Sequence, residues 1–278
     1  MGELLVIGDI AIDVLHLQDR SICSAGGAGL YTALAARRCG VPVAMIALRP
    51  EPLPGILAAF AGCLSSYIGP RVSGDDLPMF ETSPGQANAA FSRLRGGAAH
   101  LLTPDWLPAD LSQFGLLHVT PAAGPQWQLD MVRACRERGA HRISAGTFPC
   151  SSKEAAEAVR RVIAAVDIFF LNDAEAAAVY GSLDSAQAAP GRQLFVTLGA
   201  DGVLVCEGEE RTPVRAVPAA VVDPTGAGDS FCGATLAHLL QGDSPAAAAQ
   251  HGVALAAQMI SHIGPSVLLD DDQPYLIN

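Results

Sequence analysis

From residue 114 onward the sequence alternates between short apolar stretches and longer amphipathic ones. Apolar runs bounded by turn residues predict strands, and the longer stretches predict helices. Their order is strand 115–119, helix 125–138, strand 141–145, helix 152–165, strand 167–171 and helix 173–180. Strands that alternate with helices are typical of a parallel sheet with helices on both faces, so the sequence predicts an α/β fold.

The flanking segments predict further elements of the same kind. They are strand 3–8, helix 27–39, strand 41–48, a short helix at 55–63, strands 193–198, 202–207 and 211–217, and helices 226–241 and 245–262. Residues 65–100 carry glycines and prolines without a helical period, and they predict hairpins at the edge of the main fold. Half of the 278 residues are hydrophobic, which suits a single domain spanning 1–278.

Composition and charge exclude several functions. A net charge of −11 without any basic stretch argues against nucleic acid or an anionic membrane as a partner. The seven cysteines occur singly, without a C-x-x-C pair, as expected of reduced thiols in a cytoplasmic protein. No apolar run reaches the roughly 18 residues of a membrane-spanning helix, and no secretory leader is recognisable. We therefore expect a soluble cytoplasmic protein.

Polar and glycine-rich clusters follow several of the predicted strands. They are Gly8-Asp9, Asn172-Asp173, Leu198-Gly199 and the segment that begins at Asp223. Ligands of open α/β sheets bind beyond the carboxyl ends of the strands. These clusters therefore predict one site assembled from distant parts of the chain.

The segment 223–230 contains the sequence pattern that points most specifically to a chemical function. Gly226, Ala227 and Gly228 lead into a predicted helix, and the N–H groups and dipole of its first turn suit a phosphoryl group. Asp229 lies in that turn, where a carboxylate can act as general base on an attacking hydroxyl. The alternative is an ordinary helix start with an acidic first turn and glycines for packing.

The string Asp-Pro-Thr-Gly-Ala-Gly-Asp-Ser-Phe at 223–231 closely resembles the C-terminal signature of the PfkB carbohydrate kinases, the ribokinase-like family. The resemblance implies a three-layer sandwich with a mostly parallel central sheet and a small β lid. It also implies ATP and Mg²⁺ as ligands, and a catalytic base at Asp229. Gly226, Ala227 and Gly228 would form an anion hole, and Asp223 and Thr225 would lie beside a monovalent cation such as K⁺.

Two further segments agree with this family. Asn172 and Glu175 fit its N-x-x-E element, which helps to hold Mg²⁺ largely through water. The same two residues also form a good capping box, and the two roles are compatible. Thr197, Gly199 and Gly202 resemble the nucleotide-binding turn, although a plain hairpin with glycines would look alike.

The N-terminal part resembles the family's acceptor site. Asp13 matches the aspartate that binds substrate hydroxyls, whereas Asp9 is either part of that site or structural. Gly26 and Gly27 match the glycine pair whose backbone lies near the substrate. Tyr31 stands where many sugar-phosphorylating members have Asn, so it either shapes the pocket or packs beside it.

The predicted lid is small, with elements at about 14–25 and 65–100, and it could be completed by a partner in a homodimer. Its candidate contacts are Tyr67, Phe80, Gln86, Asn88 and Phe91. In the family, the neighbourhood of Gly264 and Ser266 borders the adenine and cation sites. The seven histidines show no ligand spacing, and His118 is interpreted as a core residue rather than a pocket residue.

These features predict an ATP-dependent kinase that transfers the γ-phosphate to a hydroxyl of a small polyhydroxy compound, a sugar or a cyclitol. A nucleoside kinase of the same fold is the alternative, because only the acceptor pocket would differ. A non-catalytic ligand-binding or regulatory protein is an alternative from another class, but the retention of Asp229 and Glu175 argues against it. A dinucleotide-binding oxidoreductase fits poorly, because no G-x-G-x-x-G follows the first strand.

Overall fold

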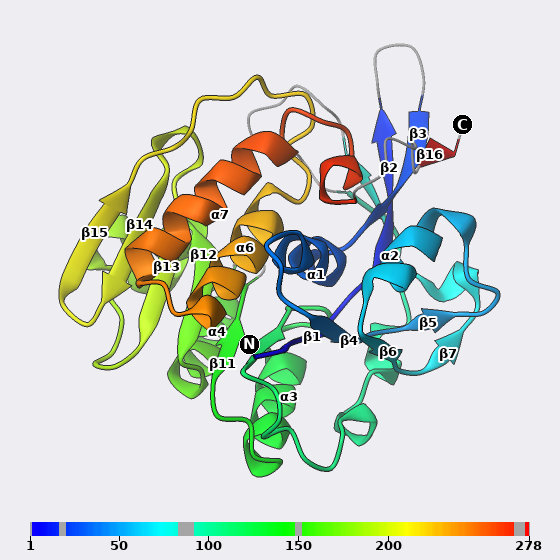
Figure 1. Cartoon of the computed structure of the whole chain (residues 1–278). Coiled ribbons are helices and arrows are strands. Elements are labelled where there is room, and N and C mark those ends of the chain that lie inside the picture. Colours follow the sequence, from blue (N-terminus) through cyan, green and yellow to red (C-terminus); the bar gives the residue numbers. More distant parts are fainter. Residues whose placement is uncertain (1, 17–20, 83–91, 148–151, 270–275, 278) are drawn as a thin grey trace.

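The structure is a computed structural model that describes residues 2–16, 21–82, 92–147, 152–269 and 276–277. Its centre is a nine-stranded sheet in the order β15-β14-β13-β12-β11-β10-β1-β4-β6 (Figure 1). The strands are β1 (Leu4–Ile7), β4 (Val43–Ile46), β6 (Ser66–Ile68), β10 (Leu116–Val119), β11 (Ile143–Ala145), β12 (Ile168–Asn172), β13 (Gln193–Thr197), β14 (Val203–Glu207) and β15 (Glu210–Val214). Neighbouring strands from β6 to β13 run parallel, and β14 and β15 add an antiparallel edge.

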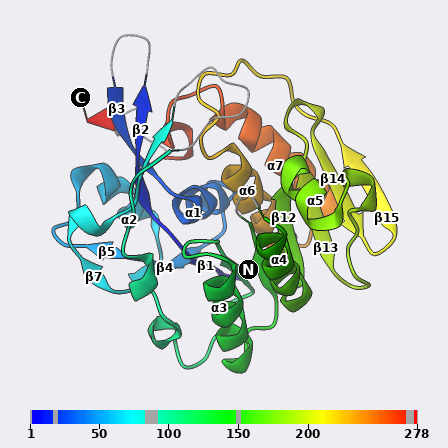
Figure 2. The same ribbon diagram turned by 180° about the vertical axis from the view of Figure 1, so that it is seen from behind.

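Helices cover both faces of this sheet (Figures 1 and 2). One layer contains α1 (Ala28–Arg38), α2 (Ala58–Cys63), α6 (Ala227–Gln241) and α7 (Pro245–Met259), and the other contains α3 (Pro125–Glu137), α4 (Lys153–Ala165) and α5 (Asp173–Tyr180). In β1, Leu4 and Val6 join the core under the first layer, whereas Leu5 and Ile7 join the core under the second. This alternation of buried side chains explains why β1 is apolar throughout, and the predicted three-layer α/β fold is confirmed.

A second, five-stranded sheet stands beside the carboxyl ends of the central strands, in the order β16-β3-β2-β8-β9. Its strands are β2 (Ala11–His16), β3 (Ser21–Gly26), β8 (Met79–Thr82), β9 (Ser92–Arg95) and β16 (Leu276–Ile277). A two-stranded sheet pairs β5 (Arg49–Pro50) with β7 (Arg71–Val72). Short 3₁₀ turns lie at Gly55–Leu57, Gly74–Asp76, Ala99–Leu101, Pro104–Trp106, Leu183–Ser185, Gly199–Asp201 and Ser266–Leu268.

The region 65–100 differs from its prediction in one respect. Its first strand, β6, pairs with β4 at the edge of the central sheet and is not part of a hairpin. Tyr67 therefore lies in the central sheet, where its hydroxyl donates to the carbonyl of Leu48 and its ring packs edge-on against Phe60. The candidates Gln86, Asn88 and Phe91 lie outside the described residues. No helix in the described part of the chain is long and apolar enough to cross a membrane.

Candidate active site

Helix α6 begins at a left-handed glycine. Gly226 is its N-cap with φ 75°, a backbone conformation that favours glycine, and a Cβ at this position would come within 2.5 Å of the ring of Tyr31. Ala227 N–H bonds to the carbonyl of Pro224 at 3.2 Å, which closes the turn before the helix. Apart from the Ala227 N–H, the first N–H groups of a helix have no partner within it, so the turn that contains residues 226–228 is suited to an anion.

Asp229 occupies the first turn of α6 and is half-buried. Burial, and to a smaller extent the nearby carboxylates of Asp9 and Glu175, together raise the pKa of its carboxyl to about 7. Its carbonyl oxygen accepts a hydrogen bond from Thr32 Oγ1 at 3.3 Å, which connects α6 to α1. A carboxylate with a pKa near neutrality is suited to accept a proton from a hydroxyl and release it again.

Asp13 lies in the middle of β2 and is only 3% exposed. Its carboxylate lies directly over Gly26 on the paired strand, where an added Cβ would be 2.0 Å from Oδ2. Burial, and to a smaller extent the carboxylates of Asp223, Asp9 and Asp229, together raise the pKa of Asp13 to about 8. Four carboxylates from the two ends of the chain therefore meet at one place, as the sequence predicted for a composite site.

Gly27 is the N-cap of α1 with φ 100°, and its Cα packs against the backbone that connects β1 to β2. One turn later, Tyr31 is 2% exposed, and its hydroxyl has no hydrogen-bond partner among the described residues. Burial raises the pKa of Tyr31 well above its usual value, and the carboxylates of Asp13, Asp223 and Asp229 contribute. Tyr31 thus packs beside the site and carries a buried hydroxyl group within the electrostatic influence of its carboxylates.

Asp223 connects the start of α6 to the segment after α7. Its Oδ1 accepts the N–H of Thr225 and its Oδ2 accepts the N–H of Gly264, both at 3.0 Å. The Oγ1 of Thr225 is buried and has no partner among the described residues. A buried carboxylate beside an unpaired hydroxyl oxygen is a donor set that fits a monovalent cation. Gly264 also packs tightly on β3, since an added Cβ would lie 2.2 Å from Ser24 Oγ.

Asn172 and Glu175 form the predicted capping box at the start of α5. Glu175 N–H donates to Asn172 Oδ1, and Asn172 N–H donates to Glu175 Oε2, both at 2.8 Å. Glu175 is 8% exposed, and burial raises its pKa to about 7 although the Asn172 N–H acts in the opposite direction. The cap fixes the position of the Glu175 carboxylate, whose negative charge contributes to the raised pKa of Asp229. The oxygen atoms of Glu175 suit Mg²⁺ held through water.

The turn after β13 is a 3₁₀ turn at Gly199–Asp201, not a simple two-residue hairpin. Gly202 has φ 99°, and an added Cβ would lie 2.1 Å from the carbonyl of Val214. Thr197 pairs with Asn172 on the neighbouring strand, so this turn adjoins the α5 cap. These contacts bring the predicted nucleotide-binding turn and the predicted Mg²⁺ element to the same edge of the sheet.

Two features that adjoin the site residues were not predicted from the sequence. The segment between β15 and α6 exposes Val217, Val221 and Val222, and it is held to the end of α7 because Val222 N–H donates to Ile260 O at 2.7 Å. Its signal in the sequence is an apolar run that lacks both helical and strand periodicity. Thr120 was also missed; its Oγ1 donates to Asp9 Oδ1 at 2.9 Å.

A pocket opens between the ends of the central strands and the second sheet. Its cavity volume is about 40 Å³, and its walls are mainly apolar, with one carboxylate. It is lined by Gly8, Asp9, Ile10, Leu48, Pro78, Phe80, Gly97, Ala99, Leu102 and Ala122. Phe80 was among the predicted contacts of this region, whereas Leu48 and Leu102 carried no signal in the sequence.

His118 is a core histidine, as interpreted from the sequence. It is 3% exposed, its Nδ1 lies 2.9 Å from Ser144 Oγ, and burial lowers its pKa to about 3. Burial therefore favours the neutral form of its ring at physiological pH.

Comparison with known proteins agrees with this arrangement. Residues 96–272, more than half of the chain, match the model of the pfkB family carbohydrate kinases. A cytidine kinase from Thermococcus kodakarensis is 26% identical over 266 residues, covering 87% of this chain and 90% of the relative.

An aminoimidazole riboside kinase from Salmonella enterica superposes with a TM-score of 0.77 at 21% identity, covering 96% of both chains. A nucleoside kinase from Methanocaldococcus jannaschii gives 0.77 at 18% identity, covering 97% of this chain and 95% of that one. The chain therefore belongs to the pfkB family of carbohydrate kinases.

Proposed function

We propose that this kinase transfers the γ-phosphoryl group of ATP to a hydroxyl of a nucleoside. The observation that carries the proposal is that Asp9, whose charge acts on both Asp13 and Asp229, also lines a largely apolar pocket. A nucleoside has a polyhydroxy sugar that can hydrogen-bond to the carboxylates, and a planar base that can pack against the apolar wall near Phe80. The similarity to a cytidine kinase along most of both chains supports this acceptor over the sugar or cyclitol expected first.

The site residues divide into an acceptor side and a phosphate side. Asp13, with its pKa near 8, holds a proton at neutral pH, so its carboxyl both donates to and accepts from acceptor hydroxyls. Asp229, with its pKa near 7, takes the proton of the attacking hydroxyl.

On the phosphate side, the N–H groups at 226–228 and the positive end of α6 stabilise the charge on the transferred group. Glu175 and Asn172 would hold Mg²⁺ through water, and the ion would neutralise the nucleotide phosphates when bound. An Escherichia coli structure of the same fold, provisionally described as a ribokinase II, contains ATP and Mg²⁺. Asp223 and Thr225 would hold a monovalent cation such as K⁺.

The nucleotide itself would bind over the 3₁₀ turn, with Thr197, Gly199 and Gly202 below its phosphates. Its base would lie against the exposed apolar segment that includes Val221, near Gly264. An exposed valine on an ordered segment held by backbone hydrogen bonds offers a flat apolar surface for a planar ring.

The test measures ADP formation with purified wild type, Asp229→Asn and Asp130→Asn against nucleosides, ribose and a cyclitol. We expect the highest kcat/KM with a nucleoside, and a loss of kcat of about 10²–10⁴ in Asp229→Asn. Asp130 is an exposed aspartate on α3 far from these residues in the sequence, and Asp130→Asn should match wild type. Highest turnover with ribose or the cyclitol would overturn the nucleoside assignment, and an Asp229→Asn variant as active as wild type would overturn the base assignment.

A further inference from the structure

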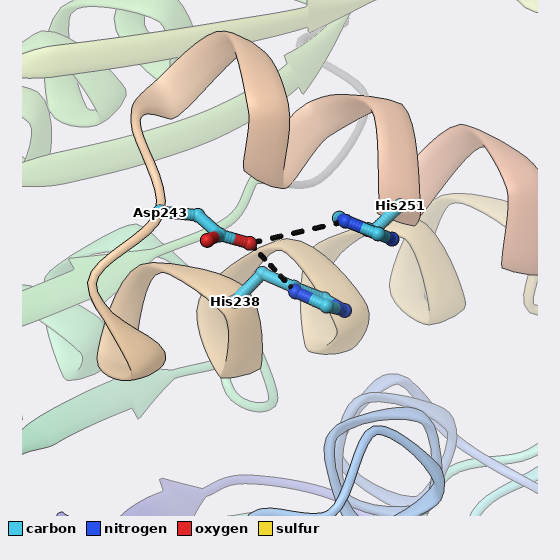
Figure 3. A group of neighbouring side chains, drawn as sticks. All are labelled: His238, Asp243 and His251. Atoms are coloured by element: carbon cyan, nitrogen blue, oxygen red, sulfur yellow. Dashed lines mark hydrogen bonds and ion pairs between the residues drawn. The ribbon is translucent and has the colours of Figure 1, made fainter.

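Three potential metal ligands meet at the turn between α6 and α7. His238 comes from the last turn of α6, Asp243 from the connecting segment and His251 from the second turn of α7 (Figure 3). Asp229 lies in the first turn of the same α6, so this cluster is at the opposite end of that helix from the proposed catalytic base. The cluster is therefore separate from the site described above.

The backbone of the turn fixes the position of the carboxylate. Gly242 ends α6 in the left-handed conformation with φ 99°, and Asp243 N–H donates to His238 O at 3.0 Å. The next residue, Ser244, caps α7 through its side chain, and Pro245 occupies the first helical position. With so short a connection, the two helices and Asp243 form one rigid unit.

The side chains already converge on one carboxylate oxygen. Asp243 Oδ2 lies 2.9 Å from His238 Nδ1 and 3.9 Å from His251 Nε2, and all three donor atoms lie within 4.8 Å of one another. Two ligand atoms of a tetrahedral Zn²⁺ ion are about 3.3 Å apart when each is about 2.0 Å from the metal. The two distances from Asp243 Oδ2 to the histidine nitrogens, 2.9 Å and 3.9 Å, lie on either side of that value.

We propose that His238, Asp243 and His251 bind a divalent transition-metal ion, with Zn²⁺ the best fit. Two imidazole nitrogens and one carboxylate oxygen form a set that Zn²⁺ prefers, whereas Mg²⁺ and Ca²⁺ prefer oxygen atoms throughout. Three protein ligands leave one position for water. The site thus differs in ligand chemistry from the all-oxygen set at Glu175 and Asn172.

Binding requires one side chain to turn. The two imidazole rings are stacked, with centroids 3.7 Å apart and planes within 6° of parallel. A metal ion lies near the plane of each imidazole that binds it, so parallel stacked rings must tilt apart to share one ion. The side chain of His251 is 55% exposed and can tilt into solvent, whereas that of His238 is only 17% exposed and stays fixed. His238 and Asp243 therefore form the prearranged part of the site.

The ion would tie the end of α6 to α7, and its effect should appear in stability. We measure thermal unfolding and calorimetric binding of Zn²⁺ with saturating Mg²⁺ present, so that the oxygen-rich active site is occupied. Wild type should bind one ion per chain at this site and gain roughly 5 °C in Tm at a hundredfold excess over Kd. With Co²⁺ in place of Zn²⁺, visible d–d absorption should appear in wild type.

His251→Asn is the principal variant, because its exposed position keeps the fold intact. It should lose the bound ion and the gain in Tm, and so should Asp243→Asn. His141→Asn replaces an exposed histidine on another loop and should behave as wild type. The proposal is overturned if wild type gains no stability with Zn²⁺, or if His251→Asn and Asp243→Asn both gain as much as wild type does.

Discussion

Gly226 lies against the ring of Tyr31, so close that a Cβ on Gly226 would come within 2.6 Å of three ring carbons. Tyr31 belongs to α1, which begins at the glycine pair on the acceptor side, and Gly226 caps α6, which carries the proposed base. The proposed acceptor side and the proposed phosphate side of the site are therefore in direct contact. Any side chain at 226 would push the two helices apart.

Gly226→Ala should consequently impair both stability and turnover. The added methyl meets the ring, and the residue must also keep φ near 75°, which costs an L-residue about 1–2 kcal/mol. We expect a loss of several degrees in Tm and at least about tenfold in kcat, because a small displacement of the first turn misplaces the base. Thermal unfolding and steady-state ADP release measure the two effects.

Gly228→Ala is the matched comparison for stability. Gly228 is in the same turn with negative φ, and an added Cβ would meet nothing within 4 Å. Its Tm should equal or slightly exceed that of wild type, because Ala favours a helix. Equal losses of Tm in the two variants would show that the contact with Tyr31 is not what requires glycine at 226.

Tyr31→Phe separates packing from substrate contact. The hydroxyl of Tyr31 is buried without a hydrogen-bond partner among the described residues, and leaving such a group unpaired costs about 1–3 kcal/mol. The ligand-free variant should therefore unfold at a higher temperature than wild type. If the hydroxyl binds the acceptor, KM for the nucleoside should rise in the same variant while KM for ATP stays the same. A lower Tm in Tyr31→Phe than in wild type would indicate that the Tyr31 hydroxyl has a hydrogen-bond partner in the folded protein.

The sequence predicted the order of the main elements because their apolar periodicity is set locally. It also predicted that the clusters at Gly8-Asp9, Asn172-Asp173, Leu198-Gly199 and Asp223 contribute to one site, since the carboxyl ends of parallel strands meet at one edge. It did not predict that β6 joins the central sheet, because a three-residue strand carries no periodic signal. The pairing of His238 with His251 was also missed, since it depends on the crossing of two helices and not on a fixed spacing in sequence.

Glu175→Gln tests whether this residue has a role beyond its cap. A glutamine keeps a side-chain oxygen that can accept the N–H of Asn172, so α5 and the Tm should be preserved. Because the negative charge is lost, the Mg²⁺ concentration needed for half-maximal activity should rise about tenfold. Asn172→Ala is the contrasting variant, since it removes the acceptor for Glu175 N–H and should lower the Tm. An unchanged Mg²⁺ requirement in Glu175→Gln would confine this residue to a structural role.

The ligand-free protein should become less stable as the pH rises from about 4 to about 8. Asp13 has a pKa near 8 in the folded state, and Asp229 and Glu175 have values near 7, against ordinary values of 3.8 and 4.5. Within this window the folded chain retains protons that the unfolded chain releases. Unfolding is then favoured as protons become scarce, so the free energy of unfolding falls with rising pH. Urea denaturation at pH 5 and pH 8, without nucleotide or Mg²⁺, measures the difference.

Asp13→Asn makes this prediction specific to the site. The variant removes the carboxyl with the highest of these raised pKa values. Its free energy of unfolding should therefore fall less between pH 5 and pH 8 than that of wild type. At pH 8 it should be more stable than wild type, although its acceptor binding is impaired, because a buried charge has been replaced by a neutral amide. The exposed carboxyls Asp110 and Glu154 have lowered pKa values, so they titrate below this window and do not affect the comparison. If wild type and Asp13→Asn lost stability equally between the two pH values, the Asp13 carboxyl could not be the cause of the loss. The assignment of a proton to Asp13 at neutral pH would then be wrong.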